Sequence, residues 1–372
     1  MRSKLTIIIF LCLSNLNSFA DSLDIDLAKK WEVGTRAGIG HIWAHVSKVN
    51  YLQTSHIYNQ EFSIARVPDG TQAWHQDFNF TKYGVLFSFA DFGNPEVGNG
   101  FSIIPFYDFS LVRGKKSWLT FRLGIGLGYL TKKWDRVSNY KNIIIGSNMN
   151  SSFDFSLNYD YAVAKRWLVS TGIALGHFSN AKFSAPNTGI NYPKVVVGLK
   201  YRNFEDQELL SITKRCVLRR SFEYVINYNV GLKENTTVDS NKYFTSNLNA
   251  MLAYRVSAKS AWGLGLDLVH DSGKIRLAKA EDGKYKSNLL AYTAIGVGPA
   301  YQFIINKSRL LFQLGYYVVN RDIMGEHFYN RLALRQEVSK QLAVHVGIRN
   351  HRVNAQTLEL GVVYQLNSPI VK

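Results

Sequence analysis

The chain has 372 residues, of which 46% are hydrophobic and 13% aromatic, and it carries a formal net charge of +17. This apolar content excludes an intrinsically disordered chain. No apolar run after residue 20 approaches the roughly 18 residues that a membrane-spanning helix needs, which excludes a helical membrane protein. The excess of Lys and Arg over Asp and Glu favours anionic partners.

The first 20 residues have the layout of a secretory signal peptide. Two basic residues, Arg2 and Lys4, precede an apolar stretch, and the segment ends in Ser18-Phe19-Ala20, a small-residue cleavage site. We therefore expect this segment to be removed on export. Cleavage leaves Cys216 as the one mature cysteine, which excludes an intramolecular disulfide.

From Trp31 onward, apolar and polar residues alternate along the chain. Apolar residues fill one face of each segment, as in the series Phe121, Leu123, Ile125, Leu127, Tyr129 and the series Trp262, Leu264, Leu266, Leu268. The other face is repeatedly Gly, Asn, Ser or charged. This period-two pattern predicts β-strands with one apolar side. Candidate strands lie near 33–43, 56–66, 82–91, 101–112, 118–130, 152–163, 166–179, 192–202, 220–232, 243–255, 260–270, 288–304, 309–320, 328–338, 342–350 and 356–366.

A soluble all-β fold gives the same alternation, but two features favour a barrel in a membrane. Most candidate strands are about ten residues or longer, whereas strands in soluble domains average roughly five or six. Short links alternate with long polar ones through most of the chain, as periplasmic turns and external loops do in outer-membrane barrels. We therefore predict an all-β, antiparallel transmembrane β-barrel of about 14 strands, in the range of about 12 to 16.

This barrel is predicted to be a single domain over residues 21–372, located in the outer membrane. Residues 21–202 form the part that carries the candidate site, and residues 203–372 add further strands. The long charged segment 203–219 leaves a second arrangement open, in which an eight-strand unit is followed by an appended one.

Three His-x-Ser pairs are candidates for nucleophilic chemistry, because positions i and i+2 of a strand share a face and bring a hydroxyl near its base. They are His45/Ser47, His177/Ser179 and His270/Ser272. The second and third pairs both continue the apolar face of a strand to its external end. Polar groups on a lipid-facing surface are costly unless they lie near the interface and serve a purpose.

The residues that follow the second pair distinguish it. They read Gly176-His177-Phe178-Ser179-Asn180-Ala181 and then Pro186-Asn187-Thr188-Gly189-Ile190-Asn191. Here the chain resembles the outer-membrane lipid A 3-O-deacylases, the PagL-type acyloxyacyl hydrolases, whose signature is His-x-Ser-Asn followed by Pro-Asn-x-Gly-Ile. The smaller members of that family are eight-stranded barrels, so the resemblance covers residues 31–202.

The resemblance implies a role for each residue of the motif. Ser179 is the nucleophile, His177 is its general base, and Asn180 and Asn187 are candidates for binding the oxyanion. The glutamate that orients the histidine in the family aligns with Asn191, which is a departure. An asparagine can hold the imidazole tautomer by accepting its N–H, but it cannot stabilise the imidazolium by charge.

The function implied is that of an outer-membrane serine esterase that removes an ester-linked acyl chain from the lipid A of lipopolysaccharide, without a cofactor or a metal. Candidates for binding the phosphorylated head group are the cations of a predicted external loop, with one beside the motif: Lys132, Lys133, Arg136, Lys141 and Lys182. Nucleic acid is not an expected partner, since the basic charge is dispersed among the strands. The oligomeric state is left open.

Two alternatives remain at this stage. Asn191 in place of the acid suggests a pore or structural barrel with a degenerate site. The pair His270/Ser272 suggests a phospholipase that uses a different strand.

Overall fold

The computed structural model describes residues 30–205, 221–239, 241–274, 292–320, 326–352 and 354–366. The predicted signal peptide and Cys216 lie outside these ranges.

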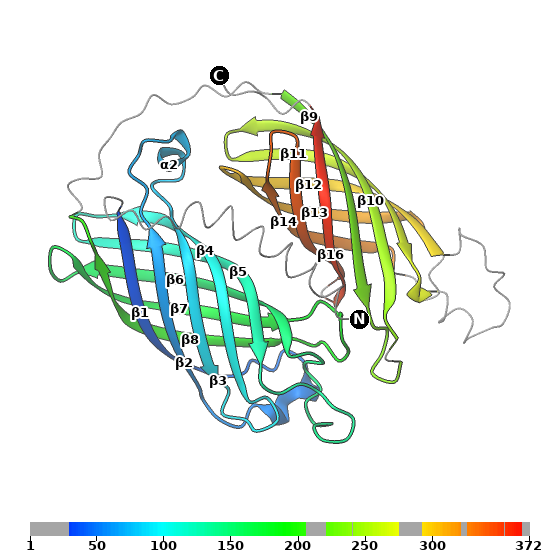
Figure 1. The fold of residues 1–372 in the computed structure, drawn as a ribbon, viewed down its shortest axis with the longest axis horizontal. Helices are drawn as coiled ribbons and strands as arrows, with labels where there is room; N and C mark the ends of the chain where they lie inside the picture. The colour runs from blue at the N-terminus through cyan, green and yellow to red at the C-terminus, as the bar shows by residue number, and fades with distance from the viewer. Residues whose placement is uncertain are drawn as a thin grey trace.

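Sixteen antiparallel strands close into two barrels of eight, which lie side by side in Figure 1. The first barrel consists of β1 (Trp31–Gly40), β2 (Ile57–Arg66), β3 (Lys82–Asp91), β4 (Asn99–Arg113), β5 (Ser117–Leu130), β6 (Met149–Ala162), β7 (Trp167–Ser179) and β8 (Ile190–Arg202). The second consists of β9 (Ser221–Lys233), β10 (Tyr243–Ser257), β11 (Ser260–Asp271), β12 (Thr293–Ile305), β13 (Ser308–Val319), β14 (Phe328–Glu337), β15 (Leu342–His351) and β16 (Asn354–Leu366).

The prediction of one barrel over residues 21–372 is thereby corrected. Strand β8 pairs back with β1, in a register that sets Arg202 opposite Glu32, and it does not pair with β9. Strand β9 pairs with β10 and β16 and so closes the second sheet by itself. The sixteen strands lie within the predicted range, and their division matches the alternative of an eight-strand unit followed by an appended one.

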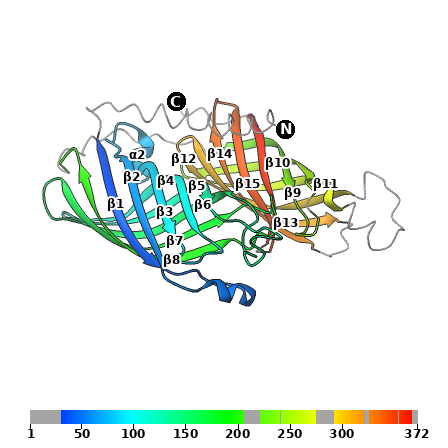
Figure 2. The same ribbon diagram turned by 60° about the horizontal axis from the view of Figure 1, so that its bottom comes forward.

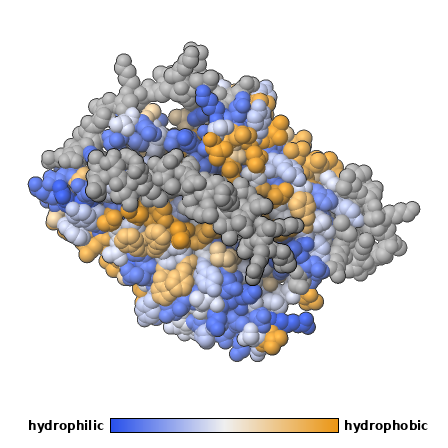
Figure 3. All heavy atoms as spheres, in the orientation of Figure 1, coloured by the Kyte–Doolittle hydropathy of each residue, from blue (hydrophilic) through white to orange (hydrophobic). Residues whose placement is uncertain are grey.

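The outer faces of both barrels are apolar and the inner faces polar, which is the reverse of a soluble sandwich. On β7, Trp167 and Ile173 expose 48% and 62% of their surface, whereas Ser170 between them is buried. Figure 3 shows apolar side chains gathered along the sides of the barrels. This arrangement is the one that a bilayer requires of a spanning barrel. Among the described residues, no helix has the length and apolar character needed to span a membrane.

Paired charges fill the interior of the first barrel. Arg122 donates two hydrogen bonds to Asp108, at 2.9 and 2.8 Å, and Arg36 donates to Glu61 at 2.8 Å. Lys200 contacts Asp160 at 2.8 Å. An eight-stranded barrel is just wide enough for its own side chains, and the ion pairs satisfy charges that are taken out of water.

The second barrel is also filled by buried charges, among which Arg331 contacts two carboxylates. Arg331 contacts Asp267 at 2.9 Å and Glu359 at 2.6 Å, and all three side chains are buried. Tyr329 also donates its hydroxyl to Asp267, at 2.6 Å. Further along the lumen, Arg309 pairs with Glu223 at 2.6 Å.

The two ends of the first barrel differ. We call the end with the links 41–56, 131–148 and 180–189 the loop end, and the end with the links 114–116 and 163–166 the turn end. The short helix η1 (Ser47–Leu52) lies at the loop end, and α2 (Ala73–Asp77) lies at the turn end, as Figure 2 shows. An apolar cluster closes the loop end; it includes Ile42, Leu52, Phe92, Ile144, Phe178, Ile190 and Tyr192.

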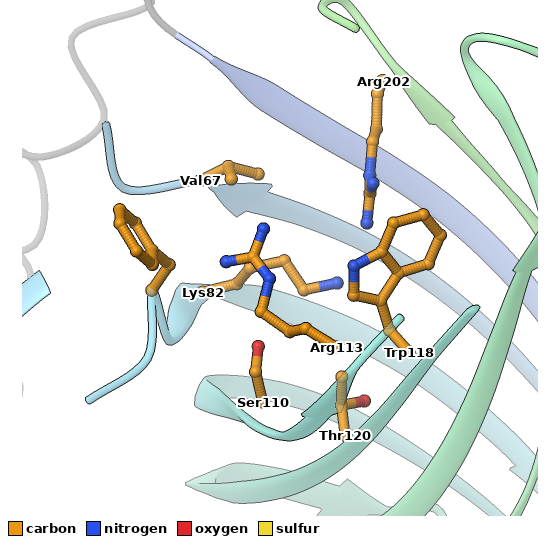
Figure 4. A pocket seen from close by; sticks show the side chains of 8 residues that line it. Val67, Lys82, Ser110, Arg113, Trp118, Thr120 and Arg202 are labelled. Carbon is orange, nitrogen blue, oxygen red and sulfur yellow. The ribbon is translucent and has the colours of Figure 1, made fainter. Parts of the chain in front are cut away.

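A small cavity of about 20 Å³ lies at the turn end of the first barrel. Figure 4 shows its lining, which consists of Val67, Phe80, Lys82, Ser110, Arg113, Trp118, Thr120 and Arg202. Arg202 ends β8, whereas the motif residues adjoin the start of that strand at Ile190. The cavity is therefore separated from the candidate site by the length of the barrel.

The barrels also contact each other near the turn end. Tyr107 on β4 and Ser308 on β13 are joined by a hydrogen bond of 3.1 Å between their hydroxyls. The rings of Phe78 and Phe303 meet edge to face with centroids 5.5 Å apart, and Lys259 lies over the Phe78 ring at 5.0 Å. A second contact, at the loop end, involves the candidate site.

Candidate active site

The His-x-Ser pair lies at the loop end of β7, on the outward face. His177 and Ser179 continue the series that contains Trp167 and Ile173, while Phe178 between them points into the apolar cluster. The register places His177 opposite Asn191 on β8, and its ring lies 5.5 Å from that of Phe153 on β6. The strand pairing thus brings the imidazole to the bilayer side of the barrel.

Asn191 links His177 to a second histidine. The Nδ1 of His177 lies 2.6 Å from the amide oxygen of Asn191, so that oxygen accepts the Nδ1–H. The amide nitrogen of Asn191 lies 3.1 Å from Nδ1 of His45 and donates to it. With the proton of His177 held on Nδ1, its Nε2 carries the free lone pair that a general base needs.

Gly189 leaves room for the imidazole ring. Its φ is +82°, a left-handed conformation that side chains other than glycine rarely adopt. A Cβ at this position would lie 2.8 Å from Cε1 of His177. The glycine of the motif is therefore required both by the turn and by the position of the histidine.

Ser179 is 6% exposed, and its hydroxyl is held by the link that follows the strand. The amide nitrogen of Asn187 lies 3.1 Å from Oγ, and the Ala181 backbone N–H donates to the same oxygen at 3.2 Å. In the described ranges, no hydrogen bond joins Ser179 to His177. The serine hydroxyl donates instead to the amide oxygen of Asn187, at 3.3 Å. Catalytic hydrogen bonds commonly tighten only with substrate.

Asn180 holds the link 180–189, which we call the motif loop. Its side-chain amide donates to Ser147 Oγ at 2.8 Å and to the Ser184 carbonyl at 2.9 Å. Its backbone N–H donates to the amide oxygen of Asn187 at 3.0 Å. The side chain of Asn180 thus fixes the loop, whereas Asn187 and the Ala181 N–H point at the serine.

Two family models match consecutive parts of the chain. The model described as lipid A 3-O-deacylase (PagL) matches residues 58–200, and the model described as acyloxyacyl hydrolase, C-terminal domain, matches residues 222–368. The chain belongs to the lipid A 3-O-deacylase family. The two matches correspond to the two barrels, and an outer-membrane location follows from this family and this fold.

Several solved structures are similar to parts of the chain. The crystal structure of the outer membrane enzyme PagL has a TM-score of 0.33 and 16% identity, and covers 44% of this chain and 97% of that one. The crystal structure of Neisserial surface protein A has a TM-score of 0.31 and 11% identity, and covers 46% of this chain and 96% of that one. A mutant porin from Rh. blastica has a TM-score of 0.18 and 8% identity, and covers 90% of this chain and 99% of that one. Comparison with curated proteins gives no match.

In this member of the deacylase family, the predicted head-group cations lie close to the motif in the fold. Lys132, Lys133, Arg136 and Lys141 are exposed on the link 131–148. That link pairs with the motif loop through a bridge between Ile145 and Asn187. Lys182 lies within the motif loop itself and is half-buried. Binding of a head group by these five residues stays a prediction.

The rival pair at the end of β11 is arranged differently. The Ser272 hydroxyl donates to the Phe244 carbonyl at 2.8 Å, and the ring of His270 meets that of Tyr292 at 6.3 Å. Like Ser179, Ser272 makes no hydrogen bond to its histidine within the described ranges. The pairs differ in the histidine: Asn191 orients the ring of His177, whereas among the described residues no hydrogen bond orients the ring of His270. The geometry of this deacylase therefore favours the pair on β7.

Three features of the site were not foreseen from the sequence. The Ala181 N–H is a backbone group, and it reaches Ser179 because Ala181 adopts a φ of +51°. His45 was considered only as half of its own His-x-Ser pair, and its contact with Asn191 spans 146 positions. The third feature is a contact from the second barrel, for which the sequence carries no local signal.

Proposed function

We propose that this protein is a serine esterase that removes an ester-linked acyl chain from lipid A. The observation that carries the proposal is the hydrogen bond of 2.6 Å between His177 and Asn191, next to Ser179 on the outward face. It fixes the base in the tautomer that accepts a proton on Nε2. Membership of the deacylase family supports an ester hydrolase as the reaction class.

The proposed reaction has two halves. Ser179 Oγ attacks the ester carbonyl while His177 Nε2 takes the hydroxyl proton, and the oxyanion that forms accepts from the Ala181 N–H and from Asn187. The intermediate collapses as His177 gives the proton to the leaving alkoxide oxygen of lipid A, so the acyl group remains on the serine. Water, deprotonated by His177 Nε2, then attacks the carbonyl of the acyl-enzyme. The second intermediate collapses as His177 returns this proton to Ser179 Oγ, which releases the free fatty acid and restores the hydroxyl.

The outward orientation of the pair suits this substrate. Acyl chains of the outer leaflet lie against the apolar face of β7, where Ile173 is exposed four residues before His177. The ester groups of lipid A lie at the level of the head groups, above those chains. The basic link 131–148 stands at the same end of the barrel and presents cations to the phosphates.

Mass spectrometry of lipid A tests the proposal. We expect production of the protein in an outer membrane to convert lipid A to a form that lacks one acyl chain, with the matching free fatty acid released by the purified protein. Unchanged lipid A and no released fatty acid would contradict it. Conductance in planar bilayers, measured in parallel, tests the pore alternative, and the ion pairs that fill both lumens lead us to expect none.

Replacement of Asn191 tests its role as the partner of the histidine. We expect Asn191→Ala to lower kcat about 100-fold, because the imidazole loses the acceptor that orients it. We expect Asn191→Glu to raise kcat about tenfold, because a charged acceptor stabilises the imidazolium more strongly than an amide does. Steady-state kinetics on purified lipid A checks both. Wild-type kcat in Asn191→Ala would show that the amide does not orient His177.

A further inference from the structure

The second barrel contacts the motif loop of the first at the loop end. Glu234, which follows β9, accepts a hydrogen bond of 2.7 Å from the Ala185 N–H, and its own N–H donates to the Lys182 carbonyl at 3.1 Å. Lys242, which precedes β10, donates to Ser184 Oγ at 2.9 Å and also to the Phe183 carbonyl. The link between β9 and β10 thus contacts four consecutive residues of the motif loop.

The two charged residues of this link support each other. Lys242 Nζ lies 2.6 Å from Glu234 Oε1, while Oε2 of the same carboxylate accepts the hydrogen bond from the Ala185 N–H. Glu234 is only 9% exposed, and the ammonium group of Lys242 lies 4.1 Å from the centroid of the Phe183 ring. A buried carboxylate that is both paired and hydrogen-bonded holds its partners more firmly than a surface ion pair does.

A chain of hydrogen bonds connects this contact to the candidate nucleophile. The Ser184 hydroxyl accepts a hydrogen bond from Lys242 Nζ, and the Ser184 carbonyl accepts one of 2.9 Å from the side-chain amide of Asn180. The Asn180 N–H donates to Asn187 at 3.0 Å, and Asn187 in turn contacts Ser179. Three hydrogen bonds, through Ser184 and Asn180, therefore connect the second barrel to Asn187, which faces the serine hydroxyl.

The motif loop needs such external support because of its backbone. Ala181 and Lys182 have φ values of +51° and +67°, which cost residues with side chains on the order of 1 kcal/mol each. Conformations of this kind persist when the surrounding contacts fix them. The Ala181 N–H reaches Ser179 only in this conformation.

We propose that Glu234 and Lys242 are positioning residues of the deacylase, through which the second barrel holds the motif loop in its catalytic geometry. The inference rests on the proposed esterase function. It gives the second barrel a role in catalysis without any group that touches the substrate. The residues that act on the ester remain those of the first barrel.

The test compares purified full-length variants in detergent micelles with lipid A as substrate. We expect Glu234→Ala to lower kcat about 30-fold with KM changed less than about twofold, since small displacements of catalytic groups cost up to about 100-fold. Glu234→Gln keeps an acceptor for the Ala185 N–H, and we expect it to retain at least about a third of wild-type kcat. Lys242→Met provides a second variant with an expected loss of about fivefold.

Tyr107→Phe is the matched control, because it removes the hydrogen bond between the barrels near the turn end and leaves the motif loop untouched. We expect its kcat to equal that of the wild type. Wild-type kcat in both Glu234→Ala and Lys242→Met, or an equal loss in Tyr107→Phe, would overturn the inference.

Hydrogen exchange of the Ala185 amide separates this inference from the proposed function. We expect exchange at this amide to be at least about tenfold faster in Glu234→Ala than in the wild type, in the absence of substrate. Unchanged exchange would show that Glu234 does not hold the loop. If exchange is faster in Glu234→Ala but the wild type releases no fatty acid, Glu234 does hold the loop. The missing release would nevertheless overturn both the esterase function and the positioning role.

Discussion

Ser179→Ala is expected to lower kcat for release of the lipid A acyl chain by at least about 10⁴-fold, and His177→Ala is expected to do the same. The serine supplies the oxygen that forms the acyl-enzyme, and the imidazole removes its proton. Since the two act as one unit, the double variant should be no slower than either single variant. Residual activity would come from the oxyanion donors, the Ala181 N–H and Asn187.

The rival pair provides the control for this experiment. Ser272→Ala and His270→Ala change the same residue types at the same end of a strand in the second barrel. We expect both to keep wild-type kcat, because His270 lacks, among the described residues, an acceptor that orients it as Asn191 orients His177. Each variant should keep the resistance to unfolding by detergent that marks a closed barrel. Loss of activity in Ser272→Ala alone would assign the chemistry to β11.

The second large effect concerns stability, at the centre of the second barrel. Arg331→Met removes the cation that contacts both Asp267 and Glu359. Asp267 is then left with neutral donors such as Tyr329, while Glu359 keeps its contact with Arg349 at 3.5 Å. Breaking a buried ion pair by removing one partner typically costs about 3–5 kcal/mol, so we expect the free energy of unfolding of this barrel to fall by at least that amount. Lys340→Met, in an exposed turn of the same barrel, should change it by less than about 0.5 kcal/mol.

Tryptophan distribution allows the two barrels to be followed separately. Trp262 is the one tryptophan after residue 203, whereas six lie in the first barrel and its links. With fluorotryptophan incorporated, the ¹⁹F signal of Trp262 reports unfolding of the second barrel in guanidinium chloride. In Arg331→Met we expect this signal to change at lower denaturant, while that of Trp167 stays near its wild-type midpoint. A common shift of all signals would show that the barrels unfold together.

The strands were predictable from the sequence, but their closure was not. Alternation over 118–130 predicted β5, which spans Ser117–Leu130, because every second side chain faces the bilayer and must be apolar. The same pattern runs through both barrels and does not reveal which strand pairs with β8. That choice is made by contacts between residues as far apart as Glu32 and Arg202, and no local pattern encodes such a pairing.

The site was predictable where the motif and the strand register coincide. His177 and Asn191 were expected to interact, and the register of β7 with β8 sets them opposite each other. His45 and Glu234 were not foreseen, because their contacts join segments 146 and 49 positions apart. The Ala181 N–H could not be foreseen either, since a backbone donor is present at every residue except proline and only the local φ aims it.

Among the described residues, the two sheets share no strand. Pairing of β1 with β8 closes the first ring, and pairing of β9 with β16 closes the second. The two rings belong to one polypeptide, in which β8 ends at Arg202 and β9 begins at Ser221. Joining two bodies in one polypeptide makes their association an intramolecular event and raises the concentration of each around the other. Docking of the rings therefore needs fewer contacts than the association of two separate chains would need.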